Sequence, residues 1–426
     1  MRPIVDIRRY PLLFLTVLLS FCLAWSKSAV SVLLTIIAAA LALRAALQPG
    51  FRRAAAKELL QPLTVPFLLM LGVSLVGVLY TETMSNGMAV VNKVLTLPLV
   101  YMAITVVLRT PPSEEESRRS GDAVLFAFMA GVLVLDVIGF LTFLGLIGQK
   151  AYVLPLAPLH VHHIWFSNLN ALGLYAAVSF FLDERMKERT SEQAFLAVYA
   201  AFSIVAIVMS QSRTAWLGVL ATGTVLAVLF SKRKKTLVAA GAAVLLGGLL
   251  AYQFSPLVKE RIEAARKDVA LYASGDVAKE TSMGDRFLMW EAALRMFRSH
   301  PFGGVGTGDY GVTLESYVRA GSFPVRLLKY NQPHNLFLFT LATTGLAGFL
   351  ALLYLFSRIF RHALPERAVP GIRQQYAFVA LATAVHFLIA GLFDSFFNIF
   401  VLRYAFAVMM AVTVRHLSEN PLITKH

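Results

Sequence analysis

The stretch that decides the fold runs from Phe254 to His334; it begins FSPLVKERIEAARKD and ends VRLLKYNQPH. It is the only long hydrophilic segment of the chain, with nine Asp or Glu and eleven Lys or Arg residues. Each charged side chain placed in hydrocarbon costs roughly 2.5 to 3.5 kcal/mol. We therefore expect this segment to fold in water, held at a membrane surface by the apolar sequence around it.

The rest of the chain is strongly apolar, since 58% of its 426 residues are hydrophobic. Many apolar runs approach the roughly 20 residues that cross a bilayer as a helix, and they are continuous rather than alternating. The sequence thus predicts an all-α polytopic membrane protein with about twelve transmembrane helices and one long periplasmic loop of short helices. The spans are expected at about 11–26, 28–47, 62–80, 87–108, 122–147, 166–182, 194–211, 214–231, 236–254, 335–357, 375–394 and 398–414.

The distribution of positive charge gives the expected orientation. The segments on one side of the membrane hold 23 of the 39 Lys and Arg residues, and such loops face the cytoplasm. Both termini are therefore predicted to be cytoplasmic, and the long segment periplasmic. The net charge of +15 is explained by orientation and contact with membrane lipids, so no nucleic-acid partner is expected. Only five cations fall in the short outer loops and span ends: Lys27, Lys93, Lys150, Arg213 and Arg403.

This orientation predicts three parts of the chain. Residues 1–254 hold the first nine spans, residues 255–333 form a periplasmic loop domain, and residues 334–426 hold the last three spans. A single cysteine, Cys22, excludes an intramolecular disulfide.

Three short helices are expected inside the long loop. Residues 255–273 have the pattern of an amphipathic helix on the membrane surface. A second helix is predicted from Arg286 to about Ser299, with Asp285 as its N-cap. The third covers about Val312 to Arg319.

Three polar residues stand where apolar spans meet the predicted outer face. Arg213 lies in a short turn between two spans, Arg286 opens an amphipathic helix, and His334 begins a span. Guanidinium groups and helix N-termini bind phosphate, and an imidazole accepts a proton from a hydroxyl. The alternatives are arginines that reach lipid headgroups and a histidine that only packs.

Other patterns indicate chemistry less directly. The tract His160–His163 has metal-binding residue types but no acidic neighbour in sequence, which favours an interfacial loop. Gly303–Gly308 lacks the Gly-Lys-Ser/Thr of a phosphate-binding loop and is interpreted as a turn. His386 and Asp394 share a face of the eleventh span, where Asp394 lies near the outer end and His386 is expected to pack.

Four short motifs, in this order, resemble the bacterial O-antigen ligase and O-antigen polymerase superfamily. They occupy the second half of the chain, roughly from Ser210 to Asp394. The motifs are Ser212-Arg213, Arg286-x3-Trp290, His300-Pro301-Phe302-Gly303-Gly304-Val305-Gly306 and Pro333-His334-Asn335.

The resemblance implies a periplasmic glycosyltransferase of the bacterial inner membrane, with a fold related to the lipid-linked, multi-span glycosyltransferases. Within this superfamily, the chain looks more like the ligase, which transfers O-antigen from undecaprenyl diphosphate to the lipid A core. Arg213 and Arg286 would then hold the donor diphosphate, His334 would be the catalytic base and Asp394 would support it. The first outer turn lacks the acidic residue expected of metal-dependent relatives, so neither a metal nor a cofactor is expected. The alternatives are the polymerase and a lipid-linked glycan transporter or flippase.

Overall fold

The computed structural model describes residues 10–58, 61–109, 113–148, 154–181, 190–231 and 282–418, with isolated positions between these ranges. Every regular element in these ranges is helical. The α-helices are α1 (Pro11–Cys22), α2 (Lys27–Leu47), α3 (Pro49–Glu58), α4 (Thr64–Val78), α5 (Met84–Leu108), α6 (Glu114–Phe143), α7 (His163–Phe181), α8 (Thr190–Met209), α9 (Arg213–Phe230), α12 (Ser282–Ser299), α13 (Tyr310–Arg319), α14 (Leu336–Glu366), α15 (Ile372–Ala390) and α16 (Phe400–Ser418). The 3-10 turns are η2 (Pro158–His160), η4 (Val325–Lys329) and η5 (Phe396–Asn398).

The predicted class, an all-α polytopic membrane protein, is confirmed. Eight of the described helices are long and apolar enough to cross a membrane, namely α2, α5, α6, α7, α8, α9, α14 and α16, and two shorter ones, α1 and α4, are also apolar. The span predicted at 236–254 and the amphipathic helix predicted at 255–273 fall outside the described ranges. The predicted number of twelve spans therefore stays a prediction.

The interior of the bundle is built from α7, α15 and α16. Almost every side chain from Val401 to Leu417 is buried, as are most of those on α15. By contrast, α2 and α8 leave large apolar side chains exposed, among them Val32, Leu43 and Val198. Apolar surface of this extent marks a surface in contact with lipid, so the polar groups buried inside the bundle are shielded from both water and lipid.

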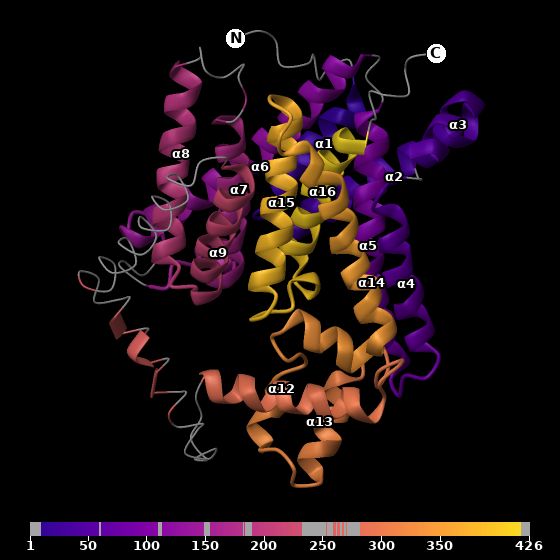
Figure 1. Ribbon diagram of the computed structural model, residues 1–426, viewed down its shortest axis with the longest axis vertical. Helices are drawn as coiled ribbons and strands as arrows, with labels where there is room; N and C mark the ends of the chain where they lie inside the picture. Colours follow the sequence, from indigo (N-terminus) through magenta and orange to yellow (C-terminus); the bar gives the residue numbers. More distant parts are fainter. Residues whose placement is uncertain are drawn as a thin grey trace.

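At one end of the bundle lies a separate layer made of α12, α13 and η4 (Figure 1). It has its own small core, in which Met289 and Met296 of α12 pack with Leu314 of α13. Ala342 of α14 joins this core, because α14 changes direction at Gly345, whose backbone angles are not helical. The first turns of α14 thus belong to the layer, and the remainder belongs to the bundle.

The glycine-rich loop after α12 docks this layer onto the bundle. The N–H groups of Val305 and Gly306 donate to the carbonyls of Ala342 and Thr343, at 2.8 and 3.3 Å. Gly304 has φ +73°, and a Cβ at this position would lie 2.4 Å from the carbonyl carbon of Thr343. Only glycine allows this approach. The loop predicted as a turn therefore has a structural role.

The turn between α4 and α5 clamps the same loop from the other side. Thr81 and the backbone N–H of Glu82 donate to the Asp309 carboxylate at 2.5 and 2.7 Å. The Tyr80 hydroxyl donates to the carbonyl of Gly303 at 2.6 Å. The layer is consequently fixed to the bundle by α4, α5 and α14 together.

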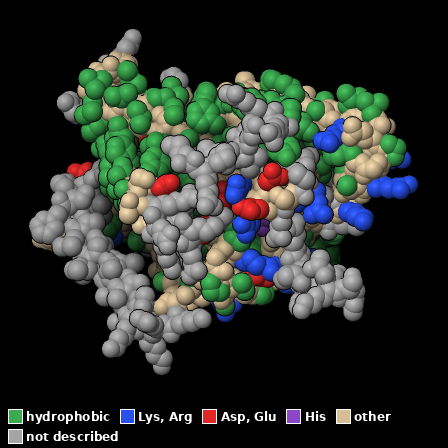
Figure 2. Space-filling model, turned by 90° about the horizontal axis from the view of Figure 1, so that it is seen from above, with side chains coloured by type: hydrophobic (Ala, Val, Ile, Leu, Met, Phe, Trp, Pro, Cys, Tyr) green, Lys and Arg blue, Asp and Glu red, His purple; other side chains and the backbone are tan. Residues whose placement is uncertain are grey.

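The opposite end of the bundle carries many of the basic side chains. Figure 2 views that end and shows Lys and Arg side chains gathered there beside a large hydrophobic area. Arg373 pairs with Glu366 at 3.0 Å, and Arg415 donates to Ser117 at 2.7 Å. This distribution agrees with a cytoplasmic assignment of that end, which remains a prediction.

Two details of the predicted helices were wrong. Asp285 is not an N-cap, because α12 begins at Ser282 and Asp285 lies in its first turn. The tenth span continues to Glu366 rather than ending near residue 357. Charged residues such as Arg358 lowered the local hydropathy, but they are compatible with a helix that extends beyond the apolar layer.

Candidate functional site

His334 and Asp394 form the centre of the site. The imidazole Nδ1 of His334 lies 3.1 Å from Oδ1 of Asp394. The aspartate side chain is almost completely buried, whereas 27% of the histidine side chain is exposed. Because a carboxylate only accepts, the pair favours the proton on Nδ1 and leaves Nε2 with a free lone pair. Nε2 of His334 is therefore able to accept a proton, and Asp394 holds the ring in place.

The backbone of His334 is held in an unusual conformation. Its φ of +48° lies in the left-handed region, which costs a residue with a Cβ about 1 kcal/mol or more. The neighbouring groups hold it there: the Trp290 indole donates to the Pro333 carbonyl at 3.0 Å, and the Asn335 amide donates to the Leu392 carbonyl at 3.0 Å. The side-chain oxygen of Asn335 also caps α14. The strain is thus balanced by contacts from α12 and from the end of α15.

The two predicted arginines belong to different elements and lie within electrostatic range of each other. Arg213 is the first residue of α9, whose N-cap is Ser212, and Arg286 lies on α12. Burial lowers the pKa of the Arg286 guanidinium; the Asp394 carboxylate opposes this shift, and the Arg213 guanidinium adds to it. Arg286 is therefore within electrostatic range of both Arg213 and Asp394. In the described ranges, Arg286 forms no ion pair or hydrogen bond with the protein.

The carboxylate of Asp285, next to Arg286 in sequence, is buried and is bound by residues near the site. Asp285 accepts from Arg326 at 2.9 Å and lies 3.6 Å from the Lys329 ammonium. It also accepts from the Tyr330 hydroxyl at 3.2 Å. The Tyr330 ring in turn lies edge-on to the His334 ring, with 5.8 Å between the centroids. Asp285 is thus engaged elsewhere and does not neutralise Arg286.

His162 is a site residue that sequence reasoning missed. Burial lowers the pKa of its imidazole; the Asp394 carboxylate opposes this, and His334 adds to it. His162 therefore lies within electrostatic range of the central pair. Its Nδ1 accepts from the N–H of Ile164 at 3.3 Å, which places the proton of the neutral ring on Nε2. The tract does form a loop, between η2 and α7, and this loop also brings a hydrogen-bond donor toward the site; its place at a membrane interface remains a prediction.

Backbone strain marks the same three segments. The non-glycine residues with positive φ among the described residues are Leu159, Gln211 and His334. Leu159 precedes His162 by three positions and Gln211 precedes Arg213 by two. Residues held in sparsely populated regions gather at functional sites. This pattern gives independent support for including His162, and it could not be read from residue types alone.

The arrangement combines a base with an anion-binding surface. Arg286 and His162 lie within electrostatic range of Asp394, Arg213 lies within range of Arg286, and the aspartate charge is already engaged by His334. Guanidinium groups bind phosphate oxygens in a two-pronged geometry. The site can therefore hold a diphosphate while His334 accepts a proton from a hydroxyl.

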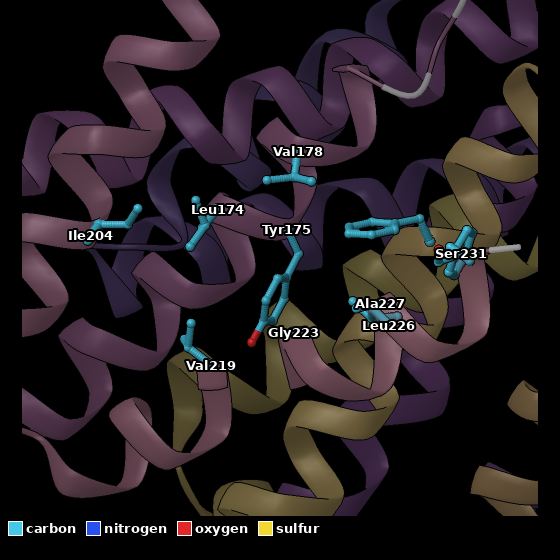
Figure 3. Close-up of a pocket in the computed structure, with 11 residues that line it drawn as sticks. Leu174, Tyr175, Val178, Ile204, Val219, Gly223, Leu226, Ala227 and Ser231 are labelled. Atoms are coloured by element: carbon cyan, nitrogen blue, oxygen red, sulfur yellow. The ribbon is translucent and has the colours of Figure 1, made fainter. Parts of the chain in front are cut away.

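A second concave feature lies within the bundle. An open pocket of about 720 Å³ is lined by residues of α7, α8, α9 and α15, and its lining is almost entirely apolar (Figure 3). Tyr175 points into it, and its hydroxyl lies 2.9 Å from Nδ1 of His386. His386 is fully buried and its Nε2 lies 2.7 Å from the Asn168 side-chain oxygen, which confirms that His386 packs. None of the predicted site residues lines this pocket.

Comparison with known proteins agrees with these motifs. An uncharacterized protein of Haemophilus influenzae is 28% identical over 198 residues, which are 45% of this chain and 48% of that protein. The chain therefore matches about half the length of this relative. The model of the O-antigen ligase family matches residues 198–353, a range that includes Arg213, Arg286 and His334. The predicted resemblance to the O-antigen ligase and polymerase superfamily is thereby confirmed for residues 198–353, which are similar to the O-antigen ligase family.

Proposed function

We propose that this protein is a metal-independent, inverting glycosyltransferase that joins O-antigen to the lipid A core. The donor would be a glycan linked to undecaprenyl diphosphate, and the reaction would take place on the periplasmic face of the bacterial inner membrane. The observation that carries the proposal is the oriented His334–Asp394 pair beside two arginines. The O-antigen ligase family match supports the class of reaction.

In the proposed reaction, a hydroxyl oxygen of the acceptor attacks the anomeric carbon of the donor sugar. His334 Nε2 takes the hydroxyl proton while the new carbon–oxygen bond forms and the bond to the diphosphate oxygen breaks. Attack from the side opposite the leaving group inverts the anomeric centre. Asp394 stabilises the imidazolium that results, as a buried carboxylate does for a catalytic histidine.

The arginines would act on the leaving group. Breaking the glycosyl–phosphate bond adds negative charge to the diphosphate, and fixed donors in a site shielded from water stabilise that charge strongly. Removal of one such donor typically costs about 3 to 4 kcal/mol in the transition state. Arg213 and Arg286 together would supply the charge stabilisation that a divalent cation supplies in other enzymes.

A reconstitution with defined lipids tests this proposal. The full-length protein is purified in detergent and mixed with undecaprenyl-diphosphate glycan and lipid A–core, with and without EDTA. A joined product that forms in both conditions supports a metal-independent ligase. Longer undecaprenyl-linked glycan formed without use of the lipid A–core would identify the polymerase instead. If neither product forms but labelled donor crosses a proteoliposome bilayer, the protein is a transporter.

A further inference from the structure

Three cations from separate helices lie close to one another in the bundle. They are Lys27 at the start of α2, Lys93 on α5 and Arg403 on the first turn of α16. Lys93 lies within electrostatic range of both Lys27 and Arg403. Lys27 is exposed, Lys93 is partly buried and Arg403 is buried. The three positive charges therefore lie at increasing depth below the protein surface.

Arg403 is held in place by neutral groups. Its Nε donates to Thr96 Oγ1 at 2.7 Å, and the Thr96 hydroxyl donates to the carbonyl of Lys93 at 2.7 Å. Its Nη1 donates to the carbonyl of Phe397 at 2.7 Å. These bonds place the guanidinium above the Lys93 turn of α5. They fix its position without neutralising its charge.

The cluster lacks a counter-charge from the described protein. In the described ranges none of the three cations forms an ion pair with a carboxylate. A guanidinium has five N–H donors, of which two are used here. The Lys27 ammonium instead lies 5.6 Å from the ring centroid of Phe400. Because like charges in a partly buried place repel strongly, this arrangement calls for a bound anion.

The cluster is continuous with the candidate site. The short turn η5 connects Asp394 with the start of α16. On one side of this turn, the Asn398 amide donates to the Gln332 side-chain oxygen at 3.1 Å, two residues before His334. Next to it, the Phe397 carbonyl accepts from Arg403. The turn η5 therefore links the cluster to the segment that carries His334.

We propose that Lys27, Lys93 and Arg403 bind a phosphate group carried by a membrane lipid. The position within the apolar bundle favours a lipid as the carrier, since α2 presents apolar side chains beside Lys27. Two lipids offer this chemistry: a phosphorylated lipid A–core and an anionic phospholipid. Only the first of these rests on the proposed function, in which it is the acceptor. The binding of phosphate by this cluster does not depend on it.

The test compares lipids that differ in one phosphate group. The full-length protein in detergent is titrated with lipid A–core, with enzymatically dephosphorylated lipid A–core, with phosphatidylglycerol and with inorganic phosphate, and bound lipid is counted by native mass spectrometry. The main variant is Lys93→Gln, because this residue is only partly buried, and Lys27→Gln is the second. Arg53→Gln, which changes an exposed cation on α3, is the matched control.

We expect Lys93→Gln to weaken binding of the phosphorylated lipid about tenfold, the usual effect of one lost charge-assisted contact. Dephosphorylated lipid should bind the variant and the natural protein equally, and Arg53→Gln should bind like the natural protein. Loss confined to lipid A–core identifies the acceptor, and equal loss for phosphatidylglycerol identifies a membrane phospholipid. Unchanged binding of every lipid by both lysine variants would overturn the proposal, as would a preference for inorganic phosphate over both lipids. This titration contains no donor, so its outcome does not depend on transfer. A failure of transfer in the reconstitution described above would refute the proposed function and leave the phosphate site intact.

Discussion

The imidazole of His334 and the carboxylate of Asp394, 60 positions apart in sequence, lie 3.1 Å apart and connect the start of α14 with the end of α15. Asp394 Oδ1 also accepts from the N–H of Ser395 at 2.8 Å, which fixes the carboxylate. The pair thus sets both the tautomer and the orientation of the imidazole that we propose as the base.

Asp394→Asn should lower the transfer rate by about 10²- to 10⁴-fold. The amide is close to the carboxylate in shape, but it no longer holds the imidazole with the proton on Nδ1. Donor binding should change little, because the phosphate contacts lie on other residues. The rate and the melting temperature are measured on the same preparation. A normal rate in a normally folded variant would show that Asp394 does not orient the base.

Arg286→Ala should weaken donor binding and slow transfer together, with a total loss of roughly 10²- to 10³-fold. The guanidinium would contact phosphate in the ground state and more strongly as the leaving group gains charge. Arg286→Lys should recover only part of this loss, because it keeps the charge without the planar fork. The control is Arg295→Ala on the same helix, whose side chain pairs with Glu291 on the surface. Equal effects of the two alanine variants would contradict a specific role for Arg286.

His162→Ala should reduce transfer about tenfold, because the site loses a neutral N–H donor. His162→Gln should restore part of the rate, since glutamine also offers an N–H group at similar reach. The control is His163→Ala; the His163 ring stacks on that of His162 with 4.3 Å between the ring centroids. A His163→Ala variant as slow as His162→Ala would indicate that this loop acts only through packing.

Gly304→Ala should destabilise the docking of the α12–α13 layer by about 1 to 3 kcal/mol. The added Cβ would collide with the backbone of Thr343, and alanine does not tolerate φ +73°. The control is Gly311→Ala in α13, where a Cβ meets nothing within 4 Å and helix propensity improves. Thermal melting in detergent measures both. Similar melting temperatures for the two variants would argue against the proposed role of the loop.

The sequence predicted the fold class and the central residues because these depend on local patterns. Continuous apolar runs identify the spans, and the uneven distribution of Lys and Arg between the loops predicts their orientation. Arg213, Arg286 and His334 stand in short motifs, each next to a predicted span or helix end. Asp394 followed from its place near the end of a span.

What the sequence did not predict depends on contacts between distant segments. Asp285 stands just before an amphipathic run and therefore resembles an N-cap, but its partner Arg326 comes 41 positions later. The bend of α14 at Gly345 occurs inside one apolar run, where hydropathy carries no signal. His162 joins the site only because its loop folds toward α14. Its two histidine neighbours pointed to metal binding or to a simple interfacial loop.

The role of His334 as base is the central claim, and one variant tests it most directly. His334→Ala should lose nearly all transfer activity per folded molecule while it binds undecaprenyl-diphosphate glycan normally, because base removal acts on the chemical step. Donor binding, melting temperature and turnover are measured on one preparation. Abolished turnover with intact donor binding and folding is the result that we predict. A His334→Ala protein with near-normal specific activity would contradict the account.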